Sequence, residues 1–331
     1  MTDKTQQTQQ TQQTQQTQQT QYGAATTGAA IDPATQVGMV SLAVADLNTS
    51  LRFYTDIFGF TLLGQQEGQA TLGTPSAPLL LLREESGAQP WPHDRYAYTG
   101  LYHFAVLVPT RRDLGRWLRH WLELGLPLPG QGDHLVSEAL YISDPDGNGI
   151  EIYRDRPRSE WHWDNGQVRM AVDPVDLRGV LAEAEQDDEP WTGLPDGTRV
   201  GHIHLQVGDI PQAIAFYHDI LGFDIVATMP SALFVSAGGY HHHIGMNTWH
   251  SRNAEPAPAG VAGLRFYTLE LPNEEARAAV VNQLTAAGAP FRETPDAVIV
   301  RDPWQNTLLL QLGPAGDAAK ASTLRAAVEG K

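Results

Sequence analysis

A long internal repeat limits the folds available to this chain more than any single motif does. Residues 37–60 align without a gap on residues 200–223, so each position of the first copy matches the position 163 residues later. The copies begin with VGMVSLAV and VGHIHLQV, and one difference between them is Met39 in place of His202. We therefore predict two related halves, and the histidine present in only one copy requires an explanation.

Each copy reads as a strand followed by a helix. In the first copy Val40, Leu42 and Val44 alternate with other residues, which is typical of a half-buried strand. After an Asp turn, apolar residues recur at helical spacing from Leu51 to Phe58, and a glycine follows at the predicted end of the helix. The second copy has the same order of elements.

A second, more diverged unit follows in each half. In the first half, YHFAVLVP (102–109) predicts a strand, TRRDLGRWLRHWLELG (110–125) a helix, and DPDGNGIEIY (144–153) a tight turn leading into a strand. In the second half the same order is predicted from a strand at 264–272, a helix at 275–288 and a strand within 302–312. The chain therefore contains four units of related design.

Composition excludes several classes of function. A chain of 331 residues with a formal charge of -16 and only 22 Lys and Arg lacks the clustered basic residues that nucleic-acid binding needs. No apolar run is long enough to span a bilayer, and no secretory signal pattern opens the sequence, so we expect a cytoplasmic protein without a membrane partner. Because there are no cysteines, any metal site must use His, Asp and Glu.

The same reading divides the chain into five segments. Residues 1–35, rich in Gln and Thr, have few apolar positions to bury and are predicted to be a disordered tail. The remaining segments are an N-terminal module pair at 36–155, a linker or crossover at 156–199, a C-terminal module pair at 200–313 and a tail at 314–331.

The recurring motifs resemble a known module. The strand, the Asp turn, the FY-x-D-x-x-GF helix and the closing DPDGN-x-I-E-I-Y strand are similar to the βαβββ module of the vicinal oxygen chelate superfamily. That superfamily includes glyoxalase I, bleomycin-resistance proteins and extradiol catechol dioxygenases. Over residues 37–312 the resemblance implies an α+β fold in which four βαβββ modules form two incomplete, curved barrels.

In that superfamily, two modules close around one metal. One ligand lies near the start of a module's first strand, and a carboxylate ligand lies on its last strand. At these positions unit two has His103 and Glu151, and unit three has His202. Unit one has Met39 at the first position and no obvious inward-pointing carboxylate on its last strand, and unit four has Phe266 and Leu309, neither of which can bind a metal.

Only one pairing of units gathers the three candidate ligands. If the units paired in chain order, His103 and Glu151 would be separated from His202 and both sites would be incomplete. Pairing unit two with unit three instead gives the two-histidine, one-carboxylate set of non-haem Fe(II) oxygenases. Fe(II) is the metal implied, and Mn(II) is the alternative. A reading without metal remains open, in which the histidines belong to the core and Glu151 is a charge at a strand edge.

Further residues are assigned only by resemblance. The stretch GYHHHIGMNTW (239–249) resembles the strand of extradiol dioxygenases that carries an acid–base histidine, and His242 is the match. On a strand, His241 and His243 would face away from His242, and which of the three faces the metal stays open. A solvated strand edge is the alternative interpretation.

Two more residues match groups that contact the substrate hydroxyl in those enzymes. Tyr141 lies ten positions before Glu151, and His134 lies seventeen before it. An ordinary packed tyrosine is the alternative for Tyr141. Trp249, Phe104 and Tyr267 are candidate walls of the pocket.

The resemblance is strongest to bacterial catechol-2,3-dioxygenase-like proteins. It implies an oxidoreductase that opens the ring of a catechol-type diol and incorporates both atoms of O2, with the catechol and O2 as its small-molecule partners. Two alternatives stay open: a glyoxalase-like isomerase or lyase with the same fold, and a metal-free binding protein. Self-association into a homo-oligomer is compatible with the sequence.

Overall fold

The structure is a computed structural model that describes residues 28–91, 98–185 and 190–314, together with positions 323, 324, 326 and 328. Residues 1–27 and most of 315–331 in the predicted tails therefore lie outside the described residues. Residues 28–35 are described, and Ile31 is buried in the core, so the prediction of a disordered tail does not hold for this last part of the segment 1–35. Within the described part, the longest helices have 13 residues. None of the described helices has both the length and the apolar character needed to cross a membrane.

The four predicted units are present, each with the element order βαβββ. Unit one comprises β1 (Gln36–Val44), α2 (Leu47–Arg52), η1 (Phe53–Phe58), β2 (Thr61–Gln66), β3 (Gln69–Thr74) and β4 (Ala77–Glu84). Unit two comprises β5 (Tyr98–Leu107), α3 (Arg111–Glu123), β6 (Gly130–Asp133), β7 (Ser137–Ser143) and β8 (Gly149–Asp155). The confirmed element order supports the reading of the sequence as repeated modules.

The second half repeats the order. Unit three comprises β11 (Arg199–Gln206), α5 (Ile210–Ala213), η3 (Ile214–Ile220), β12 (Asp224–Met229), β13 (Ala232–Ser236) and β14 (Ile244–Asn247). Unit four comprises β16 (Gly263–Leu271), α6 (Glu274–Ala286), β17 (Phe291–Glu293), β18 (Ala297–Arg301) and β19 (Thr307–Leu312). Short elements lie between units: η2 (Arg158–Glu160), β9 (Trp163–Asp164), β10 (Gln167–Val168), α4 (Leu177–Glu185) and β15 (Glu255–Pro256).

The repeated aspartates begin the helices of units one and three. The Asp46 side chain accepts a hydrogen bond from the Thr49 amide at 2.6 Å, and Asp209 accepts one from the Gln212 amide at 2.8 Å. Each satisfies a backbone donor that the first helical turn leaves unpaired. The helices then widen into the π-helical segments η1 and η3. Gly59 follows η1 with a φ of 101°, a conformation that glycine adopts without a steric penalty.

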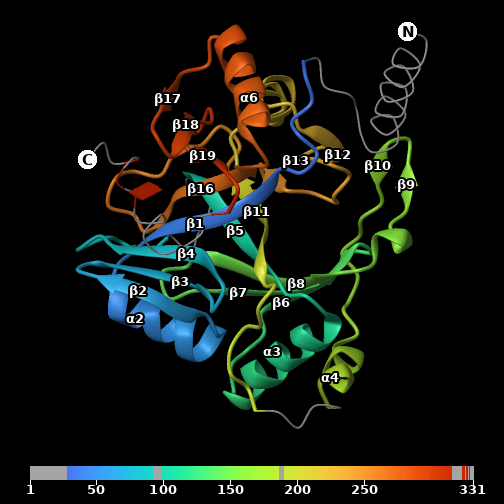
Figure 1. The fold of residues 1–331 in the computed structure, drawn as a ribbon. Coiled ribbons are helices and arrows are strands. Elements are labelled where there is room, and N and C mark those ends of the chain that lie inside the picture. Colours follow the sequence, from blue (N-terminus) through green and yellow to red (C-terminus); the bar gives the residue numbers. More distant parts are fainter. Residues whose placement is uncertain are drawn as a thin grey trace, which may run out of the picture.

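Two large sheets each combine one unit from either half of the chain. One has the strand order β17-β18-β19-β16-β1-β4-β3-β2, and the other has the order β12-β13-β14-β11-β5-β8-β7-β6. At their centres β1 pairs antiparallel with β16, and β5 pairs antiparallel with β11 (Figure 1). Unit two is thus joined to unit three, as the ligand positions predict. The domain boundaries stay predictions, because the halves of the sequence interleave in space.

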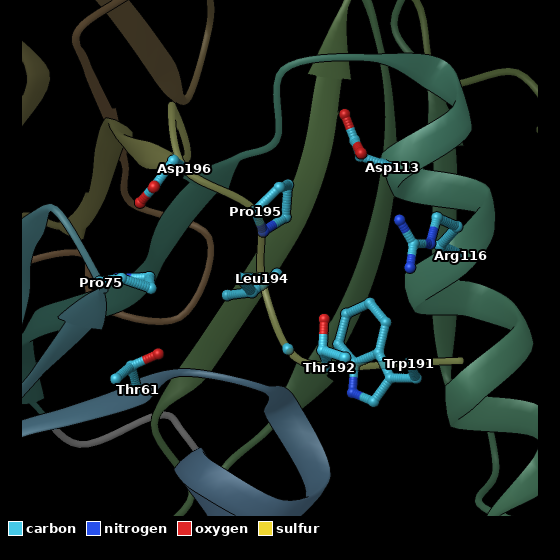
Figure 2. Close-up of a pocket in the computed structure, with 10 residues that line it drawn as sticks. Thr61, Pro75, Asp113, Arg116, Trp191, Thr192, Leu194, Pro195 and Asp196 are labelled. Carbon is cyan, nitrogen blue, oxygen red and sulfur yellow. The ribbon is translucent and has the colours of Figure 1, made fainter. Parts of the chain in front are cut away.

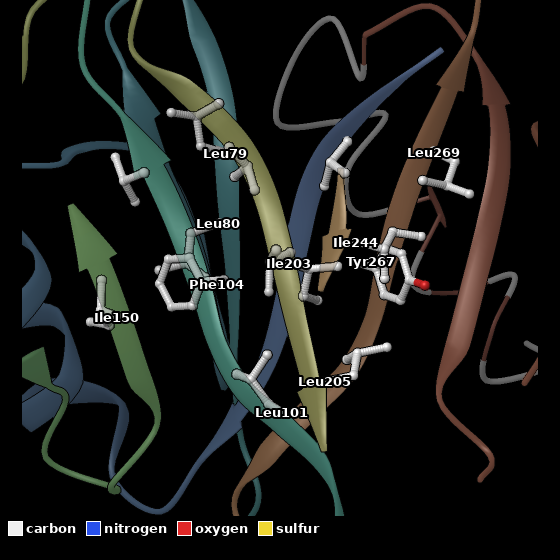
Figure 3. Close-up of a cluster of buried hydrophobic side chains, with 14 of the residues drawn as sticks. Leu79, Leu80, Leu101, Phe104, Ile150, Ile203, Leu205, Ile244, Tyr267 and Leu269 are labelled. Atoms are coloured by element: carbon white, nitrogen blue, oxygen red, sulfur yellow. The ribbon is translucent and has the colours of Figure 1, made fainter. Parts of the chain in front are cut away.

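One hydrophobic core lies between the two sheets. Phe104, Ile150 and Ile203 from the second sheet belong to the same buried cluster as Leu80 and Tyr267 from the first (Figure 3). Because successive residues on a strand point to opposite faces, the residues next to these three on β5, β8 and β11 point away from this core. The candidate ligands therefore share the outer face of the second sheet.

The corresponding face of the first sheet is apolar. Met39 and Phe266 pack there with Leu81, Leu309 and the fully buried Leu324 of the C-terminal segment. Leu81 pairs with Ser41 as Glu151 pairs with Ala105, so Leu81 occupies the place of the carboxylate in this sheet. These side chains offer no nitrogen or oxygen ligand, which agrees with the sequence-based prediction that units one and four lack the metal ligands.

Two tyrosine–aspartate hydrogen bonds tie the sheets together. Tyr54 of unit one donates to Asp144 of unit two at 2.8 Å, and Tyr217 of unit three donates to Asp302 of unit four at 2.9 Å. Both aspartates also cap the backbone of their own DP turns. Burial raises the pKa of both carboxyl groups to about 6, although the hydrogen bonds they accept oppose this rise.

We expect Tyr217→Phe to lower the free energy of unfolding by about 1.5–3 kcal/mol, the usual range for a hydrogen bond to a charged group. The Asp302 carboxyl has a pKa of about 6 in the folded protein. The loss of unfolding free energy should therefore be largest above pH 6, where the carboxylate is charged. Denaturant unfolding well above and well below pH 6 measures this difference. An equal loss at both pH values would contradict the role assigned to the ionised carboxylate.

Candidate metal centre

Three adjacent strands bring the candidate ligands together. In the order β11-β5-β8, His202 pairs with Ala105, and Ala105 pairs with Glu151. His103 lies two residues before Ala105 on the central strand and so points to the same face. All three side chains are buried, with 6% of His103, 2% of Glu151 and 1% of His202 exposed.

Their ligand atoms converge on a small volume. Glu151 Oε2 lies 3.0 Å from His103 Nε2 and 3.2 Å from His202 Nε2. One ligand atom from each residue lies within 4.8 Å of the others. Two ligands bound at about 2.1 Å to one metal, at a right angle, lie about 3.0 Å apart. The spacing of the two nitrogens from the carboxylate oxygen therefore fits a shared first-row metal ion.

The electrostatics of the cluster suit a metal. Burial lowers the pKa of His103 and of His202, so both rings are neutral near pH 7 and have a free lone pair. Burial alone would raise the pKa of Glu151. The close contacts of Glu151 with His202 and His103 outweigh that effect and hold the pKa of Glu151 well below its ordinary value. The result is two neutral imidazoles and one carboxylate.

An unsatisfied nitrogen supports the same interpretation. His103 Nε2 is buried and makes no hydrogen bond with any described residue, although Glu151 Oε2 is only 3.0 Å away. A buried polar atom without a partner is costly, and a cation between the histidine and the carboxylate would satisfy it. The donor set present thus fits a divalent metal of the Fe(II) or Mn(II) type.

Tyr141 and His134 lie together beside this cluster. Tyr141 pairs with Glu151 across β7 and β8, and its ring centroid is 5.6 Å from that of His103. Its hydroxyl is 2.6 Å from His134 Nε2, while His134 Nδ1 lies 2.7 Å from the Ala171 carbonyl. Burial, followed by the charge of Glu151, raises the pKa of Tyr141 well above 10, so its phenol keeps its proton.

His242 lies on the other side of the cluster. Its ring centroid is 4.1 Å from that of His202 and 5.1 Å from that of Phe234. Burial, and then the neighbouring imidazoles of His202 and His241, lowers the pKa of His242 well below its ordinary value. Its ring is therefore neutral and available as a base.

The expectation that the three consecutive histidines lie on a strand is wrong. Strand β14 begins at Ile244, and His241, His242 and His243 belong to the bend that precedes it. The strict alternation of a strand does not apply there, so His241 and His242 contact each other, with their Nδ1 atoms 2.8 Å apart. His243 instead accepts a hydrogen bond from the Ala237 amide at 3.1 Å.

The sequence analysis did not identify several residues that lie near His103, Glu151 and His202. His204 lies two residues after His202 on β11, and its ring contacts that of His103 at 4.9 Å between centroids. Tyr102 and Phe234 also contact His204. Alternation along β11 is the signal that could have identified His204, because residues two apart on a strand share a face.

Of the three candidate pocket walls, the structure brings only Trp249 to the cluster. Its ring lies 5.7 Å from that of His204, and 45% of Trp249 is exposed, which places it at the rim. Phe104 and Tyr267 are fully buried in the core between the sheets and cannot line the site. A separate cavity is lined by residues of α3 and the 191–196 segment (Figure 2), and it includes none of the candidate site residues.

Comparison with known proteins gives consistent results. The profile of the Glyoxalase/Bleomycin resistance protein/Dioxygenase superfamily matches residues 36–152 and 199–309. A protein of Bacillus subtilis (strain 168) named catechol-2,3-dioxygenase is 48% identical over 272 residues, which cover 81% of this chain and 94% of that protein. The metallothiol transferase FosB of Staphylococcus epidermidis is 29% identical over 124 residues, 36% of this chain and 81% of the transferase.

Solved structures agree on the fold. A Bacillus subtilis protein described as a candidate dioxygenase superposes with a TM-score of 0.55 and 13% identity, covering 92% of this chain and 96% of that one. A glyoxalase I variant from Zea mays superposes with a TM-score of 0.51 and 15% identity, covering 88% and 96% of the two chains. At such low identity these structures support the architecture alone.

Proposed function

The chain belongs to the Glyoxalase/Bleomycin resistance protein/Dioxygenase superfamily, and on this basis we propose that it is an extradiol dioxygenase that cleaves the ring of a catechol-type diol. The proposed reaction consumes one O2, inserts both oxygen atoms and yields a ring-opened hydroxymuconic semialdehyde. The observation that carries the proposal is the convergence of His103, His202 and Glu151 from strands of opposite halves. The 48% identity with the catechol-2,3-dioxygenase of Bacillus subtilis supports it independently.

His103, His202 and Glu151 are the proposed ligands of Fe(II), and Mn(II) is the other metal that this donor set accepts. When bound, the iron supplies a binding site for both diol oxygens and for O2, and it lowers the pKa of the bound hydroxyls. The protein residues around it are left with three tasks: to orient the diol, to move protons and to exclude water.

We assign the proton transfers to His242 and a hydrogen bond to the diol to Tyr141. His242 is neutral and buried beside His202, so it can accept a proton from a diol hydroxyl and return it later. Tyr141 keeps its phenolic proton and donates it to His134 Nε2, because the Nδ1–H of a neutral His134 ring donates to the Ala171 carbonyl. The Tyr141 oxygen can therefore accept a hydrogen bond from a diol hydroxyl. The aromatic rings of Tyr102, Phe234 and Trp249 surround His204 and limit access of water to the proposed ligands from that side.

A glyoxalase-like isomerase is the principal alternative, and one residue argues against it. Such an enzyme commonly uses a second carboxylate ligand from the partner module, at the position equivalent to Glu151. In unit three that position is Gly245, which pairs with His204 as Glu151 pairs with Ala105. Glycine offers no ligand atom, and a Cβ at this position would lie 3.0 Å from the His204 ring.

The proposal is tested by purifying the protein without oxygen, loading it with Fe(II), and adding catechol and O2. We expect about one iron per chain, because one ligand set is found among the described residues. We also expect a yellow ring-cleavage product, followed by its absorbance. O2 consumption measured in parallel should equal the product formed. An iron-loaded protein that forms no product from catechol or its simple alkyl derivatives would contradict the dioxygenase and favour the isomerase or a binding role.

A further inference from the structure

A chain of two hydrogen bonds connects a carboxylate outside the candidate metal ligands to His242. Asp155 Oδ1 lies 2.9 Å from His241 Nε2, and His241 Nδ1 lies 2.8 Å from His242 Nδ1. His241 is fully buried. None of these contacts involves a proposed metal ligand directly, and nothing in the proposed reaction so far uses Asp155 or His241.

The backbone explains how these residues meet. Asp155 lies four residues after Glu151 on β8, so both point to the same face of the sheet. The bend that carries His241 and His242 follows Gly238 and Gly239, whose φ angles are 58° and 66°. A Cβ at Gly238 would lie 2.2 Å from the Pro33 carbonyl oxygen, so this turn needs glycine. The turn places two consecutive rings side by side.

Hydrogen-bond chemistry fixes the direction of this chain. A carboxylate only accepts, so the proton of His241 lies on Nε2, facing Asp155. In a neutral ring the other nitrogen of His241, Nδ1, then has a lone pair and accepts from His242 Nδ1–H. The proton of His242 therefore lies on Nδ1, and its Nε2 has a free lone pair.

We propose that Asp155 and His241 are positioning residues that hold His242 in the tautomer with a basic Nε2. The catalytic part of this inference rests on the proposed function, in which His242 exchanges protons with the diol. Without the acceptor at Asp155, His241 can present Nδ1–H to His242, and the two tautomers of His242 then mix. In the other tautomer Nε2 carries a proton and cannot act as the base.

Tyr240 provides a matched control. Its hydroxyl also contacts Asp155 Oδ1, at 3.2 Å, and the hydroxyl of Tyr153 at 2.8 Å. Tyr240→Phe removes a second donor to Asp155 but leaves the chain from Asp155 through His241 to His242 intact. Asp155→Asn keeps an acceptor oxygen without the charge, whereas Asp155→Ala removes both.

The direct test is nitrogen NMR of the metal-free full-length protein labelled with ¹⁵N-histidine, because long-range correlations report which ring nitrogen carries the proton. We expect His241 protonated at Nε2 and His242 at Nδ1 in the wild type and in Tyr240→Phe. Asp155→Ala should give mixed tautomers of His242, and Asp155→Asn should retain most of the wild-type pattern.

Kinetics of the iron-loaded protein provide the second readout. Asp155→Ala should lower kcat by about 10- to 100-fold with little change in KM and in iron content, and Asp155→Asn should recover part of the loss. A wild-type His242 protonated at Nε2 would overturn the proposal, as would an unchanged His242 tautomer in Asp155→Ala. Should that variant not fold, the wild-type spectrum alone decides. If the wild type shows the expected tautomers but does not cleave catechol, the proposed function is refuted, whereas the proposed positioning of His242 by Asp155 and His241 is supported.

Discussion

Replacing His202 by Ala is expected to abolish the retention of iron. The variant leaves only His103 and Glu151 at the cluster, and the carboxylate loses the partner 3.2 Å from its Oε2. Loss of a group that merely orients a ligand commonly weakens metal binding by about 10- to 100-fold, so loss of a ligand should exceed this. Iron content after desalting, measured by metal analysis, checks the expectation.

His204→Ala is the matched control for this variant. His204 lies on the same face of β11 and is also buried, and its Nε2 faces Asn247 at 3.0 Å. Its removal should leave the iron content unchanged. Undiminished iron in His202→Ala would show that units two and three do not share a metal site.

Replacing His242 by Ala is expected to leave iron bound and to lower kcat by about 10²- to 10⁴-fold, the usual contribution of a positioned acid–base group. His242 is not among the three residues whose ligand atoms converge, so iron content should match the wild type. Steady-state kinetics with catechol, normalised to bound iron, measure the effect.

The neighbouring histidine supplies the control. Burial lowers the pKa of His243 to about 3, and its Nδ1 accepts a hydrogen bond from the Ala237 amide. We therefore assign His243 a structural role. His243→Ala should lower the melting temperature and leave kcat per bound iron nearly unchanged. A His242→Ala protein with wild-type kcat would remove His242 from the reaction.

Much of the fold could be predicted from the sequence because the repeat carries it. The matching of Val37 with Val200 defines two related halves, and both copies form the predicted strands, β1 and β11. The prediction that these strands are half-buried is wrong, because nearly every residue of both is buried. The pairing of units two and three could also be inferred, because only that pairing brings His103 and Glu151 to His202. The apolar residues at the equivalent positions of the other sheet, Met39 and Leu81, agree with this reasoning.

Other features depended on geometry that a sequence pattern does not contain. The triple histidine was assigned to a strand by resemblance to the histidine-bearing strand of extradiol dioxygenases, but it lies in the bend that follows the turn at Gly238 and Gly239. The role proposed for Asp155 depends on a contact between residues 86 positions apart, which no local periodicity reveals. Phe104 and Tyr267 were candidate walls by residue type, whereas their strand positions direct them into the core.

Crystals of the iron-loaded protein, measured on both sides of the iron absorption edge, test the central claim most directly. We predict a single anomalous peak per chain, within bonding distance of His103 Nε2, His202 Nε2 and a carboxylate oxygen of Glu151. A peak elsewhere in the protein, or a peak bound by His103 and Glu151 while His202 points away, would contradict the account.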